Sequence, residues 1–199
     1  MLENKKKFCV VFAGGGTGGH IYPGIAVADE LQSLAKSHNV EIEIHWIGSS
    51  SGMDRSIVEK NLVSCGGSIT AFHGIACGKL RRYFDPKNFS DPFKVIKGYT
   101  EASRLIKKLK PDIVFSKGGF VTVPVVLAAK RRGVPAIIHE SDMTPGLANK
   151  ICIPCATKVC CNFPETLSHL PEGKAVLTGS PIRQELTKGN KIAALDLCG

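Results

Sequence analysis

The chain has 199 residues, of which 43% are hydrophobic and 22% charged, and its formal net charge is +9 at pH 7. This length suffices for one full domain, or one domain and the start of another, and the ordinary hydrophobic content excludes a disordered protein. No stretch approaches the ~20 consecutive apolar residues of a membrane-spanning helix, and the apolar run near the N-terminus is too short for a signal peptide. We therefore expect a cytoplasmic protein whose positive charge favours nucleic acid, an acidic membrane surface or phosphorylated ligands as partners.

Short apolar runs alternate with segments of helical periodicity. The predicted strands are 8–13, 41–48, 112–116, 135–140, 157–161 and 175–179. The predicted helices are 23–37, 51–61, 91–110 and 122–133. Continuously apolar strands are typical of a parallel sheet covered on both faces. The alternation predicts an α/β fold, a Rossmann-like doubly wound parallel sheet with right-handed crossovers.

The segment 91–110 shows the helical pattern clearly, and Pro111 ends it before the next strand. Its predicted apolar stripe consists of Phe93, Ile96, Ala102, Leu105, Ile106 and Leu109. Basic residues concentrate in 78–89 and 128–133, without the spacing of a known base-reading motif. We therefore expect no nucleic acid partner.

Eight cysteines occur in the chain, and four of them lie close together in the stretch CIPCATKVCC. The stretch contains one CxxC pair, Cys152 and Cys155, but no second pair or nearby histidine that would complete a tetrahedral zinc site. We predict buried, reduced thiols rather than a zinc site, because unpaired cysteine often packs as a small hydrophobe. No metal ligand set is expected.

The stretch AGGGTGGH, residues 13–20, follows the first predicted strand and precedes the first helix. An open α/β sheet binds ligands at this place, and N–H groups at a helix start attract anions. The loop lacks the lysine of a phosphate-binding Walker A loop. Gly14, Gly16 and Gly19 have dinucleotide-site spacing, but the second strand ends in WIGSS, without the acidic residue that would hold a ribose. A tight strand-to-helix turn is the structural alternative.

Four stretches together resemble one enzyme family: GGGTGGHIYPGIAVADEL (14–31), WIGSSSGMDRSIVEK (46–60), KPDIVFSKGGFVTVPVVLAAKRRGVPAIIHESDMTPGLANK (110–150) and LTGSPIRQEL (177–186). In this order they resemble the N-terminal half of the peptidoglycan N-acetylglucosaminyltransferases that convert lipid I to lipid II. The similarity spans about residues 8–187.

The resemblance implies a GT-B glycosyltransferase, in which two Rossmann-like domains face one another across a cleft. Residues 1–180 would form the acceptor-binding domain, and residues 181–199 the linker and the start of a donor-binding domain that this chain lacks. The implied reaction is inverting transfer of GlcNAc from UDP-GlcNAc to undecaprenyl-pyrophosphoryl-MurNAc-pentapeptide, without a metal or other cofactor, and this half would be inactive alone. Two alternatives are a non-catalytic, membrane-docked acceptor-binding subunit of a split transferase, and another GT-B transferase or a nucleotide-sugar epimerase.

Two residues are candidates for the catalytic base. His20 has a side-chain pKa near neutrality, which suits it to take a proton from the acceptor hydroxyl. Glu140 is the rival base, or it orients His20 or a sugar. The alternative for His20 is a role in capping the helix or orienting the loop.

The remaining site residues are assigned by their match to the family's motifs. Those expected to bind substrate are Thr17, Gly18 and Gly19 in the first loop, Lys117, Gly118 and Gly119 in the second, and Asp142 and Arg183. In the second loop, Lys117 would add a mobile positive charge for the acceptor diphosphate; a structural strand-to-helix junction is the alternative. Asp142 stands where many family members have asparagine, so an ionised side chain there only accepts hydrogen bonds. Arg183 suits the UDP diphosphate or linker carbonyls.

The segment 73–89 mixes aromatic and basic residues, a composition that suits the headgroup layer of an anionic membrane. The predicted membrane-contact residues are Ile75, Lys79, Leu80, Arg81, Arg82, Tyr83 and Phe84. A loop whose apolar residues pack inward is the alternative. The expected partners are UDP-GlcNAc, lipid I, the cytoplasmic face of the bacterial membrane, where the protein would be peripheral, and other cell-wall synthesis proteins.

Overall fold

The structure is a computed structural model that describes residues 7–78 and 91–198. Seven strands form one sheet in the order β3-β2-β1-β4-β5-β6-β7, and all neighbouring strands are parallel. The strands are β1 Lys7–Gly14, β2 Glu41–Ser49, β3 Ala71–Ile75, β4 Ile113–Gly118, β5 Ala136–Glu140, β6 Lys158–Cys161 and β7 Ala175–Leu177. The predicted Rossmann-like α/β fold is confirmed.

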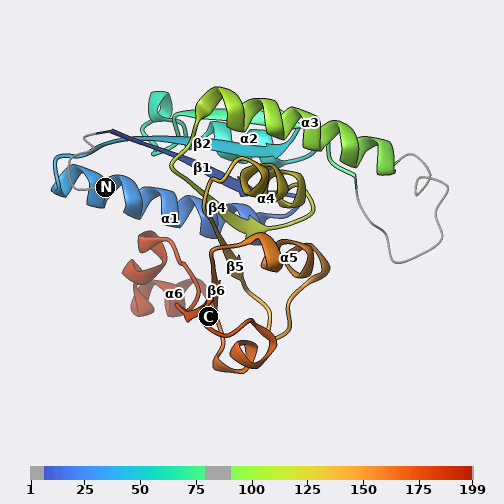
Figure 1. The fold of residues 1–199 in the computed structure, drawn as a ribbon. Coiled ribbons are helices and arrows are strands. Elements are labelled where there is room, and N and C mark those ends of the chain that lie inside the picture. The colour runs from blue at the N-terminus through green and yellow to red at the C-terminus, as the bar shows by residue number, and fades with distance from the viewer. Residues whose placement is uncertain (1–6, 79–90, 199) are drawn as a thin grey trace.

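Helices cover both faces of this sheet. The α-helices are α1 Gly18–Ser37, α2 Asp54–Glu59, α3 Asp91–Leu109, α4 Thr122–Arg131, α5 Leu147–Cys152 and α6 Lys191–Cys198. Short 3-10 helices are η1 Val63–Cys65, η3 Ile153–Cys155, η4 Pro164–His169 and η5 Gln184–Lys188. Figure 1 shows α1 on one side of the sheet and α3 and α4 on the other.

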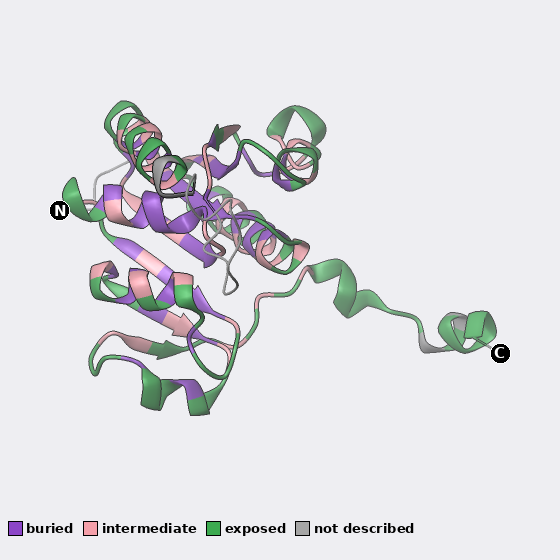
Figure 2. Ribbon diagram, turned by 90° about the vertical axis from the view of Figure 1, so that its right-hand side faces the viewer, coloured by how far each residue is buried: buried purple, intermediate pink, exposed green. Residues whose placement is uncertain are grey.

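The core consists of two apolar layers, one on each face of the sheet. Successive side chains of a strand point to opposite faces, so Val10 and Phe12 belong to the layer under α1, and Val11 and Ala13 to the layer under α3 and α4. Trp46 is fully buried in the α1 layer and stacks on Phe12 with ring centroids 5.9 Å apart. Figure 2 shows buried residues concentrated in the sheet and on the inner sides of the helices.

The structure corrects several predicted boundaries. The edge strand β3 was missed because its sequence, AFHGI, is short and interrupted by histidine and glycine. Helix α1 begins at Gly18, before its internal Pro23, and not at residue 23. The helix predicted over 51–61 is limited to Asp54–Glu59, and α5 was not predicted. In α3, Ala102 and Ile106 are buried as predicted, but Ile96 is 64% exposed.

The membrane-contact prediction for Ile75 is wrong. Ile75 is the last residue of β3 and its side chain is fully buried in the layer under α3 and α4. The other predicted contact residues, Lys79 to Phe84, lie outside the described residues. Within the described part of the chain, no helix is both long and apolar enough to cross a membrane.

Two of the four cysteines in the stretch CIPCATKVCC are buried, as predicted. Cys152 and Cys161 are buried, whereas Cys155 and Cys160 are half-buried. Burial raises the pKa of the Cys152 thiol to about 12, so this thiol is protonated at neutral pH.

The C-terminal segment after β7 contributes little to the core. Helices η5 and α6 are exposed, and Figure 2 shows them extending away from the sheet. The division at residue 180 into a domain and a linker stays a prediction.

Candidate active site

The two glycine loops lie side by side at the carboxyl edge of the sheet. They follow β1 and β4, which are neighbouring strands, and Gly14 pairs with Gly118 across them. Gly118 and Gly119 have φ angles of +104° and +89°, which side chains rarely adopt. A Cβ atom on Gly119 would also overlap the carbonyl oxygen of Gly15. The two loops therefore pack backbone against backbone, and glycine is required at this contact.

The first loop ends at the N-terminus of α1. Thr17 is the N-cap residue, in an extended conformation, and its side chain makes no capping hydrogen bond. The first N–H groups of a helix have no partner within it, and the described residues supply none for Gly18 and Gly19. Thr17 and Gly19 are exposed. These donors and the Thr17 hydroxyl are available to an anionic ligand.

Asp54, from the start of α2, holds the first loop in place. Its buried carboxylate accepts N–H hydrogen bonds from Gly16 at 2.9 Å and from Ser49 at 2.7 Å. A Cβ atom on Gly15 would overlap this carboxylate. The sequence analysis missed Asp54, which lies four residues beyond the WIGSS stretch, at the start of α2.

The His20 imidazole lies between the two loops. A Cβ atom on Gly118 would be 3.3 Å from His20 Cε1 and Nδ1, so the ring packs directly on the second loop. Among the described residues, Nδ1 of His20 is buried without a hydrogen-bond partner. Burial and the nearby positive charge of Lys117 lower the pKa of His20 from 6.5. The ring is therefore neutral at pH 7, the form that accepts a proton.

Lys117 is buried at the end of β4, with 2% of its surface exposed. Its ammonium group donates a hydrogen bond to the Ser141 hydroxyl just beyond β5. Burial lowers the pKa of Lys117, while the charges of Glu140 and Asp142 act in the opposite direction. The expectation of a mobile charge is wrong, because the side chain is buried and its ammonium group is hydrogen-bonded to Ser141.

Glu140 is also buried, and hydrogen bonds occupy both oxygens of its carboxylate. Oε1 accepts the backbone N–H of Asp142 at 2.9 Å, and Oε2 accepts the N–H of Gly146 at 3.0 Å and the amide of Asn149 at 2.8 Å. These bonds tie the loop after β5 to the start of α5. Because both oxygens are occupied, the geometry favours a structural role for Glu140 in this loop over a role as the catalytic base.

Two predicted ligand contacts lie at the margin of this edge. The Asp142 side chain is exposed, and its charge raises the pKa of His20, against the larger effect of burial. Arg183 lies over the Tyr22 ring of α1, with its guanidinium carbon 4.8 Å from the ring centroid. Together with α1 and α2, residues 181–188 line a groove of about 810 Å³.

The structure thus gathers most of the predicted site at the adjacent ends of β1, β4 and β5. The residues brought together there are Thr17, Gly18, Gly19, His20, Lys117, Gly118, Gly119, Glu140 and Asp142. Sequence reasoning missed the supporting residues Asp54, Ser141 and Asn149. They lie within the stretches 46–60 and 110–150, but their hydrogen bonds become visible only in the folded chain.

Comparison with known proteins gives consistent results. Residues 10–161 match the family described as "Glycosyltransferase family 28 N-terminal domain". A Lachnoclostridium phytofermentans protein named UDP-N-acetylglucosamine--N-acetylmuramyl-(pentapeptide) pyrophosphoryl-undecaprenol N-acetylglucosamine transferase is 60% identical over 96% of this chain and 50% of its own length. A protein of the same name from Lachnospira eligens is 58% identical over 95% of this chain and 50% of its own length. The chain spans about half the length of the curated relatives it matches.

Solved structures show the same relationship at the level of the fold. The crystal structure of MurG from Acinetobacter baumannii matches with a TM-score of 0.67 and 28% identity, over 92% of this chain and 49% of that one. A UDP-GlcNAc 2-epimerase from Neisseria meningitidis matches with a TM-score of 0.59 at 13% identity, over 87% of this chain and 46% of that one. This second likeness concerns the fold alone.

Proposed function

The chain belongs to glycosyltransferase family 28, and from this membership we propose that it is the acceptor-binding half of a peptidoglycan N-acetylglucosaminyltransferase. The proposed reaction transfers GlcNAc from UDP-GlcNAc to the muramyl sugar of undecaprenyl-pyrophosphoryl-MurNAc-pentapeptide. Residues 1–180 would bind this acceptor, and residues 181–199 would lead into the donor-binding half. The observation that carries the proposal is the position of His20 between two glycine loops at one edge of the sheet.

In the proposed mechanism, His20 acts as the general base. The imidazole takes the proton of the acceptor hydroxyl as its oxygen bonds to the anomeric carbon of GlcNAc. The bond from that carbon to the UDP phosphate oxygen breaks, UDP leaves, and the configuration inverts. The N–H groups of Gly18 and Gly19 would meanwhile bind a pyrophosphate, because a helix start attracts anions.

In the proposed reaction the acceptor-binding half works together with a donor-binding half, and a chimera provides both. The 199-residue chain is joined to the second half of its 60% identical Lachnoclostridium phytofermentans relative. We expect the chimera to form the lipid II product from lipid I and UDP-GlcNAc. A chimera that folds and binds both substrates, but transfers no GlcNAc to lipid I, would contradict the proposed function.

The pH dependence of kcat/KM of this chimera tests whether Lys117 lowers the pKa of His20. Burial and the charge of Lys117 lower the pKa of His20 from 6.5, and the base acts only when neutral. We therefore expect the acid limb of the kcat/KM profile to lie below pH 6.5. Lys117→Met removes a positive charge near the ring, which raises the pKa of His20. We therefore expect the acid limb of the kcat/KM profile to move to higher pH.

The matched control is Lys130→Met, since Lys130 is an exposed lysine of α4. Its pH profile should coincide with that of the unchanged chimera. An acid limb that stays in place in Lys117→Met would show that Lys117 does not influence the titrating group.

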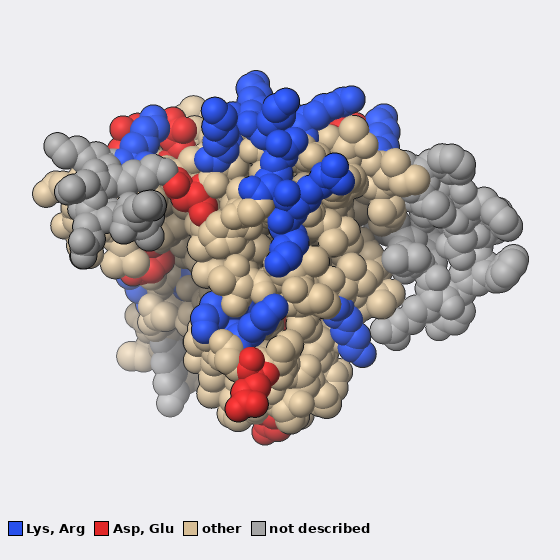
Figure 3. All heavy atoms as spheres, viewed as in Figure 1, with Lys and Arg blue, Asp and Glu red and all other residues tan. Residues whose placement is uncertain are grey.

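We also propose that the protein docks on an anionic membrane, the location of its lipid-linked acceptor. Arg104 and Lys107 of α3 and Arg131 and Arg132 at the end of α4 line a groove of about 400 Å³. Figure 3 shows lysine and arginine side chains gathered over α3 and α4. Each cation near an anionic surface contributes ~1 kcal/mol of binding free energy. This basic surface would add to the predicted contacts of residues 79–84.

Co-sedimentation of the chain with vesicles tests this docking. We expect binding to phosphatidylglycerol vesicles and little binding to phosphatidylcholine vesicles. The variant Arg131→Glu/Arg132→Glu should lower the affinity for the anionic vesicles at least tenfold, since about 1.4 kcal/mol corresponds to a factor of ten.

A second variant controls for the overall charge. Lys36→Glu/Lys60→Glu makes the same change of charge at exposed positions of α1 and the end of α2, across the sheet from α3 and α4. Its affinity should change little. Equal losses in the two variants would show that net charge, and not the basic surface, determines binding.

A further inference from the structure

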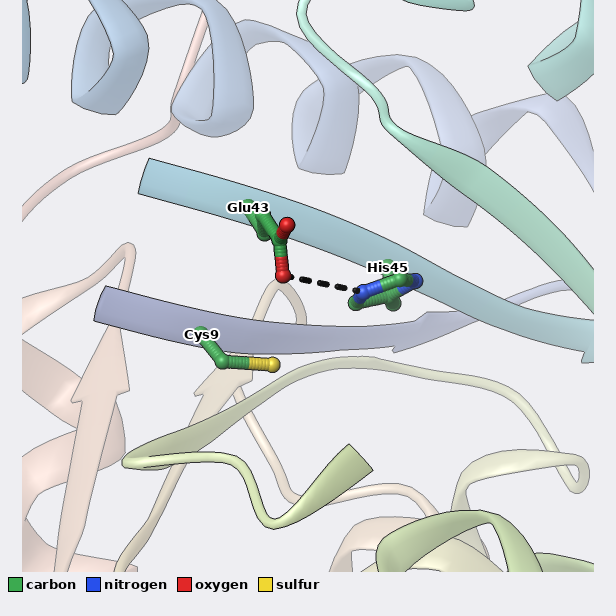
Figure 4. Close-up of side chains that lie close together, drawn as sticks. All are labelled: Cys9, Glu43 and His45. Atoms are coloured by element: carbon green, nitrogen blue, oxygen red, sulfur yellow. Dashed lines mark ion pairs between the residues drawn. The ribbon is translucent and has the colours of Figure 1, made fainter. Parts of the chain in front are cut away.

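A second cluster of reactive side chains lies at the opposite end of the sheet from the glycine loops. Cys9 is near the start of β1, and Glu43 and His45 are near the start of β2. Cys9 pairs with Glu43, and His45 is two residues further along the same strand. Because side chains alternate along a strand, all three lie on one face. Figure 4 shows the three side chains close together on the two neighbouring strands.

The three side chains bring different ligand atoms together. The Cys9 sulfur, a Glu43 carboxylate oxygen and a His45 ring nitrogen all lie within 4.8 Å of one another. The His45 Nε2 atom is 4.0 Å from Glu43 Oε2, the pair joined by the dashed line in Figure 4. All three residues are half-buried, so an ion from solvent can reach them.

His45 and Glu43 each contact a further residue through the polar atom that does not face the cluster. His45 Nδ1 lies 3.1 Å from His73 Nε2 in a hydrogen bond, and the Lys7 ammonium lies 2.9 Å from Glu43 Oε1. When Nδ1 of His45 donates this bond, the lone pair of Nε2 is free to bind a cation. Metal-binding histidines are usually oriented in this way, by a partner at the second ring nitrogen.

We propose that Cys9, Glu43 and His45 form a binding site for one zinc ion. Thiolate sulfur, imidazole nitrogen and carboxylate oxygen are the ligands that Zn²⁺ takes in proteins, and three protein ligands leave a fourth position for water. The thiolate and the carboxylate together neutralise the charge of the ion. Zinc bound here would link β1 to β2 and would release the Cys9 thiol proton.

Cobalt binding to the 199-residue chain tests the site, because Co²⁺ replaces Zn²⁺ and absorbs light. We expect one equivalent of Co²⁺ to produce a thiolate-to-cobalt charge-transfer band, and one equivalent of Zn²⁺ to remove it. Cys9→Ser should abolish the band, and Glu43→Gln and His45→Gln should each weaken binding at least tenfold. His73→Phe should weaken it about 10–100-fold without changing the stoichiometry, as expected for an orienting partner.

Cys65→Ser is the matched control, since Cys65 is exposed and distant in the sequence from the cluster. This variant should bind Co²⁺ like the unchanged chain. Zinc should also raise the thermal midpoint of the unchanged chain and of Cys65→Ser, but not that of Cys9→Ser. A charge-transfer band that survives in Cys9→Ser, or no band at all, would overturn the proposal.

Discussion

Replacing His20 with alanine lowers kcat of the chimera by about 10²–10⁴-fold, the usual contribution of a general base. The affinity for UDP-GlcNAc should stay nearly unchanged, because the proposed role of the imidazole is proton transfer. Initial rates of lipid II formation and equilibrium binding of UDP-GlcNAc measure the two quantities separately. A large loss in kcat with intact donor binding supports the base role.

His38→Ala is the control for this prediction, since His38 is exposed at the other end of α1. Its activity should equal that of the unchanged chimera. The rival base is tested by Glu140→Gln, which keeps the size of the side chain. Retained turnover in His20→Ala would contradict the base role of His20, and retained turnover in Glu140→Gln would exclude Glu140 as the base.

Gly119→Ala should destabilise the chain by about 2–5 kcal/mol. A φ angle of +89° costs an alanine about 1–2 kcal/mol, and the new Cβ atom overlaps the carbonyl oxygen of Gly15. The two glycine loops must then separate, so the chimera should also lose transferase activity. Urea denaturation of the 199-residue chain gives the free energy of unfolding.

Gly133→Ala separates backbone strain from this overlap. Gly133 has a φ angle of +69°, but a Cβ atom there would meet no atom within 4 Å. We expect this variant to lose only about 1–2 kcal/mol and to keep full activity. If the two variants lose the same stability, the packing of the two loops contributes nothing.

Local sequence patterns were sufficient to predict much of the fold. Continuously apolar strands such as 8–13 and 112–116 alternate with helical segments, and this pattern predicts a covered parallel sheet without tertiary information. Pro111 marked the end of α3 by the same kind of local rule. The patterns failed where burial is partial: β3 is a short edge strand, and Ile96 has a helical apolar position yet is 64% exposed.

Local sequence patterns also predicted part of the candidate site. Glycine runs after strands, and a histidine at the end of the first run, are visible in the sequence. The burial of Lys117 and the three hydrogen bonds that occupy Glu140 are not visible, because these contacts exist only in the folded chain. The predicted mobile lysine and the rival base were therefore assigned without knowledge of these partners.

The sequence by itself determined the α/β class, the two glycine loops and the identity of His20, because each depends on residues that are close together along the chain. Only the tertiary structure decided that β4 lies beside β1, although about a hundred residues separate Gly14 from Gly118. The same sheet order brings His20 onto the second loop and gathers Cys9, Glu43 and His45 at the far edge. The physical reason is that contacts across parallel strands join distant segments, and such contacts leave no periodic pattern in the sequence.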